Sequence, residues 1–161
     1  MRDDKASVEE RLDIMELFAK YCWALNTGDA EGYVGLFVDG GWVDHKPQGR
    51  CQGREAMIKL LGQIWYGMPH NYLGRQHHAD NFLIRRGGDG LRVRAYWTVN
   101  RLEQATNTFY LFIQGNWDAL CVQDASGEWK FKELTVTHWY RDTAPWVGDP
   151  KARIQRETAW G

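Results

Sequence analysis

The hydrophobic period of this chain changes once, near position 75, from helical to alternating. Before that point apolar residues recur at spacings of three and four, as in Leu12, Met15 and Phe18, which is the pattern of a helix face. Beyond it, residues 91–99 alternate between apolar and polar side chains, which is the pattern of a half-buried strand. Helices grouped at the start and strands at the end favour an α+β domain with a mainly antiparallel sheet.

Three helices are expected in the first part of the chain. A capping box at Ser7-Val8-Glu9-Glu10 begins the first helix, and Gly28 can take the left-handed conformation that ends it. The apolar stripe of this helix consists of Val8, Leu12, Met15, Phe18, Cys22 and Leu25. Asp29 can cap a short second helix over 29–37, and a third is expected over 54–68.

One short strand and four long strands complete the expected fold. They cover residues 42–45, 76–86, 91–100, 108–122 and 129–140, and hairpin turns join the last four. The chain has no internal repeat and no interdomain linker, so residues 1–161 are predicted to form a single domain with its core at about 7–140. Residues 141–161 are expected to form a flap or to contact another subunit.

The charge balance argues against a nucleic-acid-binding protein. The chain has 20 Lys and Arg against 21 Asp and Glu, whereas such a protein would normally carry a basic excess. Cys22, Cys51 and Cys121 are odd in number and unpatterned, which fits a reduced, cytoplasmic setting. The charged N-terminal segment is followed by no apolar stretch long enough for a signal or a membrane span, so no membrane contact is expected.

Aromatic residues are abundant, at 14% of the chain. Most of them are expected to fill the core. Four tryptophans, however, stand near expected strand ends and beside polar residues: Trp42, Trp97, Trp117 and Trp139. Because pockets for flat apolar ligands are lined in this way, we predict that these four contact a substrate.

The segment from Gln76 to Asn81 places several polar side chains at the start of a strand. Alternation puts His77 and Asn81 on one face and His78 and Asp80 on the other, so only one of the adjacent histidines can enter the interior. An imidazole held on a rigid strand suits proton transfer. We therefore predict that His77 is a general base and that Asn81 shares its cavity. No metal site is expected, because no HxxxH or HxxE spacing stands on a helix.

Five motifs of the chain occur in an order that is typical of one family. They are Tyr21 to Asp29, Val38 to Val43 with Gly53 to Ala56, His77 to Asn81, Gly115 to Asp118, and Gly127 to Phe131. On these motifs the chain resembles the SnoaL-like branch of the NTF2-like superfamily. The resemblance implies a cone-shaped fold, in which a strongly curved sheet packs on three N-terminal helices and leaves an apolar cavity open at one end.

The resemblance also implies roles for individual residues. In a bile-acid dehydratase and a hexachlorocyclohexane dehydrochlorinase of this family, a catalytic His matches His77, and the Asp that orients it matches Asn26. A Tyr of the bile-acid enzyme matches Tyr21, and a further Asp falls near Asn100. The final-strand Arg of the dehydrochlorinase falls at Leu134, so that role is absent here.

The amide at Asn26 changes what the pair can do. A carboxylate would stabilise the imidazolium and raise the basicity of the His, whereas a carboxamide orients the ring without adding charge. In a serine protease triad the comparable change from Asp to Asn lowers turnover by about ten-thousand-fold. Either another carboxylate pairs with His77, with Asp29, Asp44 and Asp80 as candidates, or the site needs only a neutral imidazole.

The predicted function is that of a cofactor-independent lyase of the dehydratase type, or of an isomerase. His77 would remove a proton from a small apolar cyclic or aromatic substrate, while Tyr21 and Asn26 hydrogen-bond the departing hydroxyl or the developing oxyanion. The alternative is a non-catalytic ligand-binding or assembly subunit, similar to the small subunit of ring-hydroxylating dioxygenases. A homodimer or homotrimer is expected, with no metal and no cofactor.

Overall fold

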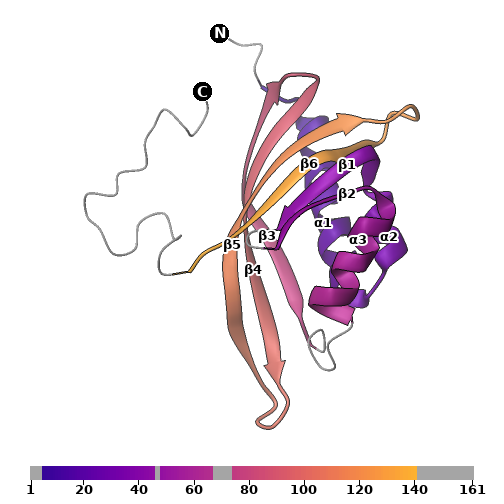
Figure 1. Cartoon of the computed structure of the whole chain (residues 1–161). Coiled ribbons are helices and arrows are strands. Elements are labelled where there is room, and N and C mark those ends of the chain that lie inside the picture. The colour runs from indigo at the N-terminus through magenta and orange to yellow at the C-terminus, as the bar shows by residue number, and fades with distance from the viewer. Residues whose placement is uncertain (1–4, 46–47, 67–73, 141–161) are drawn as a thin grey trace.

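Three helices cover one face of a curved sheet (Figure 1). The computed structural model describes residues 5–45, 48–66 and 74–140, and the expected flap over 141–161 lies outside them. The helices are α1 (Val8–Thr27), α2 (Ala30–Gly35) and α3 (Arg54–Leu61), and α3 continues into a short π-helix, η1 (Gly62–Tyr66). Within the described residues, none of the helices is long and apolar enough to cross a bilayer.

The sheet has six strands in the order β2-β1-β6-β5-β4-β3. They are β1 (Phe37–His45), β2 (Gly49–Gln52), β3 (Gln76–Gly87), β4 (Gly90–Glu103), β5 (Thr108–Gln123) and β6 (Trp129–His138). All neighbouring strands are antiparallel except β1 and β6, which pair in parallel. The α+β architecture with a curved, mainly antiparallel sheet on N-terminal helices is thus confirmed, and the sheet does not close into a barrel.

Two boundaries near the first strand differ from the expectation. The second helix ends at Gly35, and Phe37 already belongs to β1. β2 was not among the expected strands, and it pairs with β1 from Trp42 opposite Gln52 to His45 opposite Gly49. The pairing with β1 provides hydrogen bonds that a segment of four residues could not form alone.

Helix α1 has the expected ends but buries a different face. Ser7 and Glu10 form the capping box, and Gly28 takes a φ of 80° at the C-terminus. The expected stripe is wrong in its first half, because Val8, Leu12 and Met15 are exposed. The buried side chains are Ile14, Leu17, Phe18, Tyr21, Cys22, Ala24 and Leu25. Two apolar stripes overlap on this helix, and the one that contacts the sheet includes the hydroxyl-bearing Tyr21.

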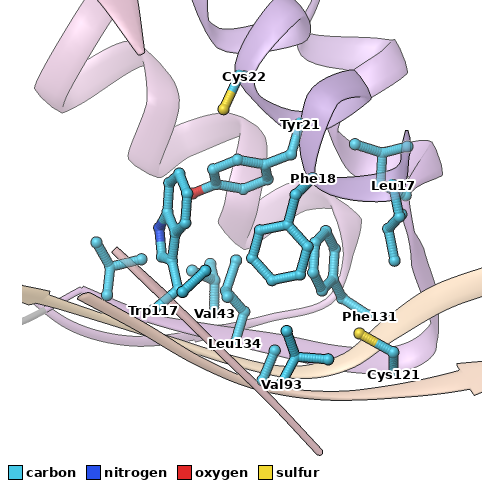
Figure 2. Packing of buried hydrophobic residues seen from close by; sticks show 14 of the residues in the cluster. Leu17, Phe18, Tyr21, Cys22, Val43, Val93, Trp117, Cys121, Phe131 and Leu134 are labelled. Carbon is cyan, nitrogen blue, oxygen red and sulfur yellow. The ribbon is translucent and has the colours of Figure 1, made fainter. Parts of the chain in front are cut away.

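An aromatic core fixes α1 on the sheet. Figure 2 shows Phe18 and Tyr21 of α1 directed toward Trp117 of β5 and Phe131 of β6. The ring of Phe18 lies 5.1 Å from that of Phe131 and 5.4 Å from that of Trp117. Each such ring removes enough apolar surface from water to stabilise the fold by about 1.5–3 kcal/mol. This packing therefore holds the last turns of α1 against the inner face of the sheet.

Candidate functional site

A cavity of about 200 Å³ opens beside the aromatic core, between the end of α1 and the inner face of the sheet. Its polar lining side chains are Tyr21, His45, Gln48, Arg75, His77, His138 and Tyr140. Its apolar lining side chains are Leu25, Ile64, Trp97, Val99, Phe112, Ile113, Trp117 and Val136. The cavity therefore combines aromatic walls with a few convergent polar groups, as ligand sites commonly do.

Asn26 and His77 are joined by two hydrogen bonds to one oxygen. Oδ1 of Asn26, in the last turn of α1, lies 2.7 Å from Nδ1 of His77 on β3. The same oxygen accepts a hydrogen bond from the backbone N–H of His77 at 3.0 Å. The predicted pairing of these two residues is thus present in the structure, with a carboxamide at the position where the resemblance implies a carboxylate.

The second hydrogen bond fixes the protonation pattern of the ring. A backbone N–H only donates, so the Asn26 atom that faces it must be the carbonyl oxygen. The Nδ1 atom of His77 must then carry a proton and donate to that oxygen. In the neutral ring this leaves the lone pair on Nε2, which is the atom that a general base would use.

Burial keeps His77 neutral at ordinary pH. Burial, together with the positive charges of Arg75, His45 and His78, lowers the pKa of His77 from 6.5 to about 3. Asn26 supplies no opposing charge. The site therefore holds a neutral imidazole, one of the two possibilities that the sequence left open.

Two further histidines meet at the cavity from β1 and β6. His45 is buried at the end of β1. Burial and the positive charge of His138 lower the pKa of His45 to about 4, against the opposing effect of the negative charge of Asp44. The ring of His138 lies 6.1 Å from that of His45 and 5.1 Å from that of Trp97. Because β1 and β6 run in parallel, their ends come to the same side of the cavity.

Besides His77, three of the residues singled out in the sequence line the cavity, namely Tyr21, Trp97 and Trp117. Tyr21 is almost completely buried, and its ring meets that of Trp117 edge-on at 5.5 Å. Trp97 lies beside Trp117, with 6.1 Å between the rings, and packs over Gly115 of β5. A Cβ at position 115 would overlap the indole and the Thr137 carbonyl, so the glycine makes room for this aromatic wall.

Four residues expected in the cavity lie outside it. Trp42 stacks on the Arg50 guanidinium at 3.8 Å, and Nε1 of Trp139 donates to Asn116 Oδ1 at 2.9 Å. Both residues lie on the outer face, because the adjacent Val43 is fully buried in the core and the adjacent His138 lines the cavity. Each of these tryptophans is therefore a correction to the expected substrate contacts.

Asn81 and Asn100 are corrections for different reasons. Asn81 is exposed and has a φ of 52°, at a register shift between Asp80 and Leu83 that interrupts the alternation of β3. Asn100 follows the cavity-lining Val99 and so faces outward, where its Nδ2 lies 3.3 Å from Nε2 of His78. The outward placement of His78 agrees with the prediction.

Arg75 is a charged cavity residue that was not among the predicted site residues. It precedes β3, is 7% exposed and lies two positions before His77 in the sequence. Alternation backward from His77 would have placed it on the inner face.

Of the carboxylates proposed as partners of His77, Asp29 caps α2 and Asp80 is exposed. In the part of the chain that the structure describes, no group of three or more His, Cys, Asp or Glu is placed to hold a metal ion.

Comparison with known proteins gives a family match and a common fold. The sequence pattern of the SnoaL-like domain matches residues 6–135. No curated protein sequence matches the chain significantly. Among solved structures, ActVI-ORFA from Streptomyces coelicolor has a TM-score of 0.72 at 18% identity, over 80% of this chain and 96% of its own.

Two other similar structures show the same arrangement. An Asp-to-Asn variant of Rv3472, a protein of unknown function from Mycobacterium tuberculosis, has a TM-score of 0.67 at 21% identity, over 81% of this chain and 72% of its own. LinA has a TM-score of 0.69 at 16% identity, over 83% of this chain and 88% of its own. At these identities the structures establish a shared fold.

Proposed function

Since this chain belongs to the SnoaL-like domain family of the NTF2-like superfamily, we propose that its cavity is the active site of a cofactor-independent lyase or isomerase. The substrate would be small, apolar, and cyclic or aromatic, since the cavity measures about 200 Å³ and is walled by Trp97 and Trp117. His77 would act as the general base. The observation that carries the proposal is the pair of hydrogen bonds from His77 to Asn26, which directs the proton to Nδ1 and the lone pair to Nε2.

The reaction would begin with proton transfer to Nε2 of His77. In an elimination, the electrons of the C–H bond form the new double bond while the leaving group departs with its own electron pair. Tyr21, which lines the same cavity, would hydrogen-bond the departing oxygen or a developing oxyanion. An isomerase would use the same first step and then return the proton to another carbon.

The low pKa of His77 limits which protons can be removed. A base whose conjugate acid has a pKa of about 3 is weak, so the substrate C–H must be acidified by a neighbouring carbonyl or leaving group. The same weakness favours the second candidate, a non-catalytic ligand-binding subunit. The open cavity favours the enzyme, because a purely structural subunit would have its cone filled by side chains.

Ring opening of 5-nitrobenzisoxazole tests His77 without knowledge of the natural substrate. This neutral bicyclic compound loses one C–H proton to a base, its N–O bond breaks, and a coloured phenolate forms. We expect the wild-type protein to accelerate the reaction at pH 7.5 and His77→Gln to lower the rate by about a hundredfold. The rate is measured from the absorbance of the phenolate.

Two variants serve as controls for this experiment. His78→Gln changes the adjacent histidine on the outer face and should leave the rate unchanged. Asn26→Asp should raise the rate and add a pH inflection, because a carboxylate beside Nδ1 raises the pKa and basicity of His77. Equal rates for the wild-type and His77→Gln proteins would contradict the general base and leave the ligand-binding subunit as the better proposal.

A further inference from the structure

Arg75 brings a buried positive charge to the cavity. Its side chain is 7% exposed and lines the cavity together with His77. Burial and the neighbouring Arg101 lower the pKa of Arg75 to about 10, which still leaves the guanidinium protonated at neutral pH. A buried cation is costly, and negative charge or hydrogen bonds reduce that cost. At the wall of a cavity, the guanidinium of Arg75 can pair with an anionic group of a ligand.

A second guanidinium stands near the first. Arg75 and Arg101 both approach the ring of Phe112, with their Cζ atoms 5.6 Å and 4.8 Å from its centroid. Nε of Arg101 is buried and makes no hydrogen bond to any residue that the structure describes. Two like charges around one aromatic ring make this edge of the cavity electropositive.

The rest of the lining adds no negative charge. The described lining residues include Arg75 and three histidines, and none of them is an Asp or a Glu. The described lining of the cavity is therefore positively charged at neutral pH through Arg75.

We propose that the natural substrate carries a carboxylate, or an equivalent oxyanion, and that Arg75 binds it at the Phe112 edge of the cavity. The proposal rests on the proposed function, since it names the substrate class of the same site. The ring of the substrate would lie against Trp97, with the reacting carbon near Nε2 of His77. A carboxylate bound to Arg75 would also offset one of the positive charges that lower the pKa of His77.

Calorimetric titration with 2-naphthoate and 2-naphthamide tests this assignment. The two compounds share a flat bicyclic ring and differ mainly in the charge of one group. The wild-type protein should bind naphthoate at least about tenfold more tightly than naphthamide, as expected for a charge-assisted hydrogen bond. Arg75→Gln should remove that preference and leave the affinity for naphthamide within about threefold.

Three further proteins complete the design. Arg75→Met, whose unbranched side chain fills a similar volume, replaces Arg75→Gln if the latter does not fold. Arg85→Gln, at an exposed position on β3, should keep the preference for naphthoate. His77→Gln should also keep it, so that a failure of the general base is distinguished from a failure of the anion site.

Two results would overturn the anion site. One is equal affinity of the wild-type protein for naphthoate and naphthamide. The other is a preference for naphthoate that persists in Arg75→Gln, or in Arg75→Met where that variant replaces it. Neither result depends on whether His77 removes a proton.

Discussion

The two faces of the sheet use similar residues in opposite ways. On the outer face polar side chains pair with one another: Asn116 accepts from Trp139, donates to Asp118 at 2.7 Å, and Asp118 in turn pairs with Arg94. On the inner face polar side chains converge on a cavity, among them His77, whose Nδ1 donates a hydrogen bond to Asn26 Oδ1. The polar groups of the outer face thus satisfy one another's hydrogen bonds, whereas those of the inner face line a cavity that can hold a ligand.

The inner face is itself divided into two parts. Around Phe18 and Phe131 it is a close-packed aromatic core, and around His77 and Arg75 it is an open cavity. Trp117 belongs to both parts, since its ring contacts Phe18 and also lines the cavity. The comparison indicates that stability resides mainly in the first part, and that the second sacrifices packing to hold a ligand.

Truncation in the core should give the largest effect on stability. Phe131→Ala removes a fully buried ring that lies 5.1 Å from Phe18 and 5.3 Å from Phe37, so the free energy of unfolding should fall by about 3–5 kcal/mol. Urea denaturation measures the change. Phe109→Ala, at a ring that is 62% exposed, should change it by less than about 0.5 kcal/mol. Similar losses for both variants would contradict the statement that the stability resides mainly in the aromatic core.

Acid should weaken the fold through the cavity histidines. His45 and His77 have folded-state pKa values of about 4 and about 3, below the ordinary 6.5, so the unfolded chain binds more protons between these values. Their stabilisation is therefore complete above pH 6.5 and is lost as the pH falls. Each of the two histidines should lower the free energy of unfolding by about 2 kcal/mol as the pH falls from 6.5 to 5. This pH range lies above the titration of ordinary carboxyl groups.

Urea denaturation at pH 7.5 and at pH 5 measures this loss. His77→Gln should reduce the difference in unfolding free energy between the two pH values. The matched control is His78→Gln, on the exposed outer face, which should change the difference much less, because the charge of His78 is the smallest cause of the low pKa of His77. An identical pH dependence in the wild-type and His77→Gln proteins would show that His77 is not held neutral by burial.

Much of the fold could be predicted from the sequence because local signals specify it. The capping box at Ser7, the left-handed Gly28 and the alternation from 91 to 99 each act within a few residues, and the structure has all three. The parallel pairing of β1 with β6 joins segments far apart in the chain, and no local pattern encodes it. For that reason the meeting of His45 and His138 was missed.

The site was predictable only where alternation continues without interruption. His77, Trp97 and Trp117 were placed correctly, since each stands in a regular part of its strand. Asn81 lies within a register shift between Asp80 and Leu83, which interrupts the alternation of side chains. No local sequence pattern indicates this shift. Trp42 and Trp139 were predicted as substrate contacts because they are aromatic, near expected strand ends and beside polar residues. These features do not distinguish a face that binds a ligand from one that stacks on neighbouring side chains.

A pair of tryptophan variants tests the two faces with the smallest expected effect on stability. Trp139→Phe removes the donor to Asn116 but keeps an aromatic ring near Tyr96, so unfolding should become easier by only about 0.5–1.5 kcal/mol. Its rate of 5-nitrobenzisoxazole opening should equal that of the wild-type protein, because the side chain lies on the outer face. Trp97→Phe, on the inner face, should lower that rate because it reshapes the cavity wall. If Trp139→Phe lowered the rate as much as Trp97→Phe does, the outer face would have to contribute to the site after all.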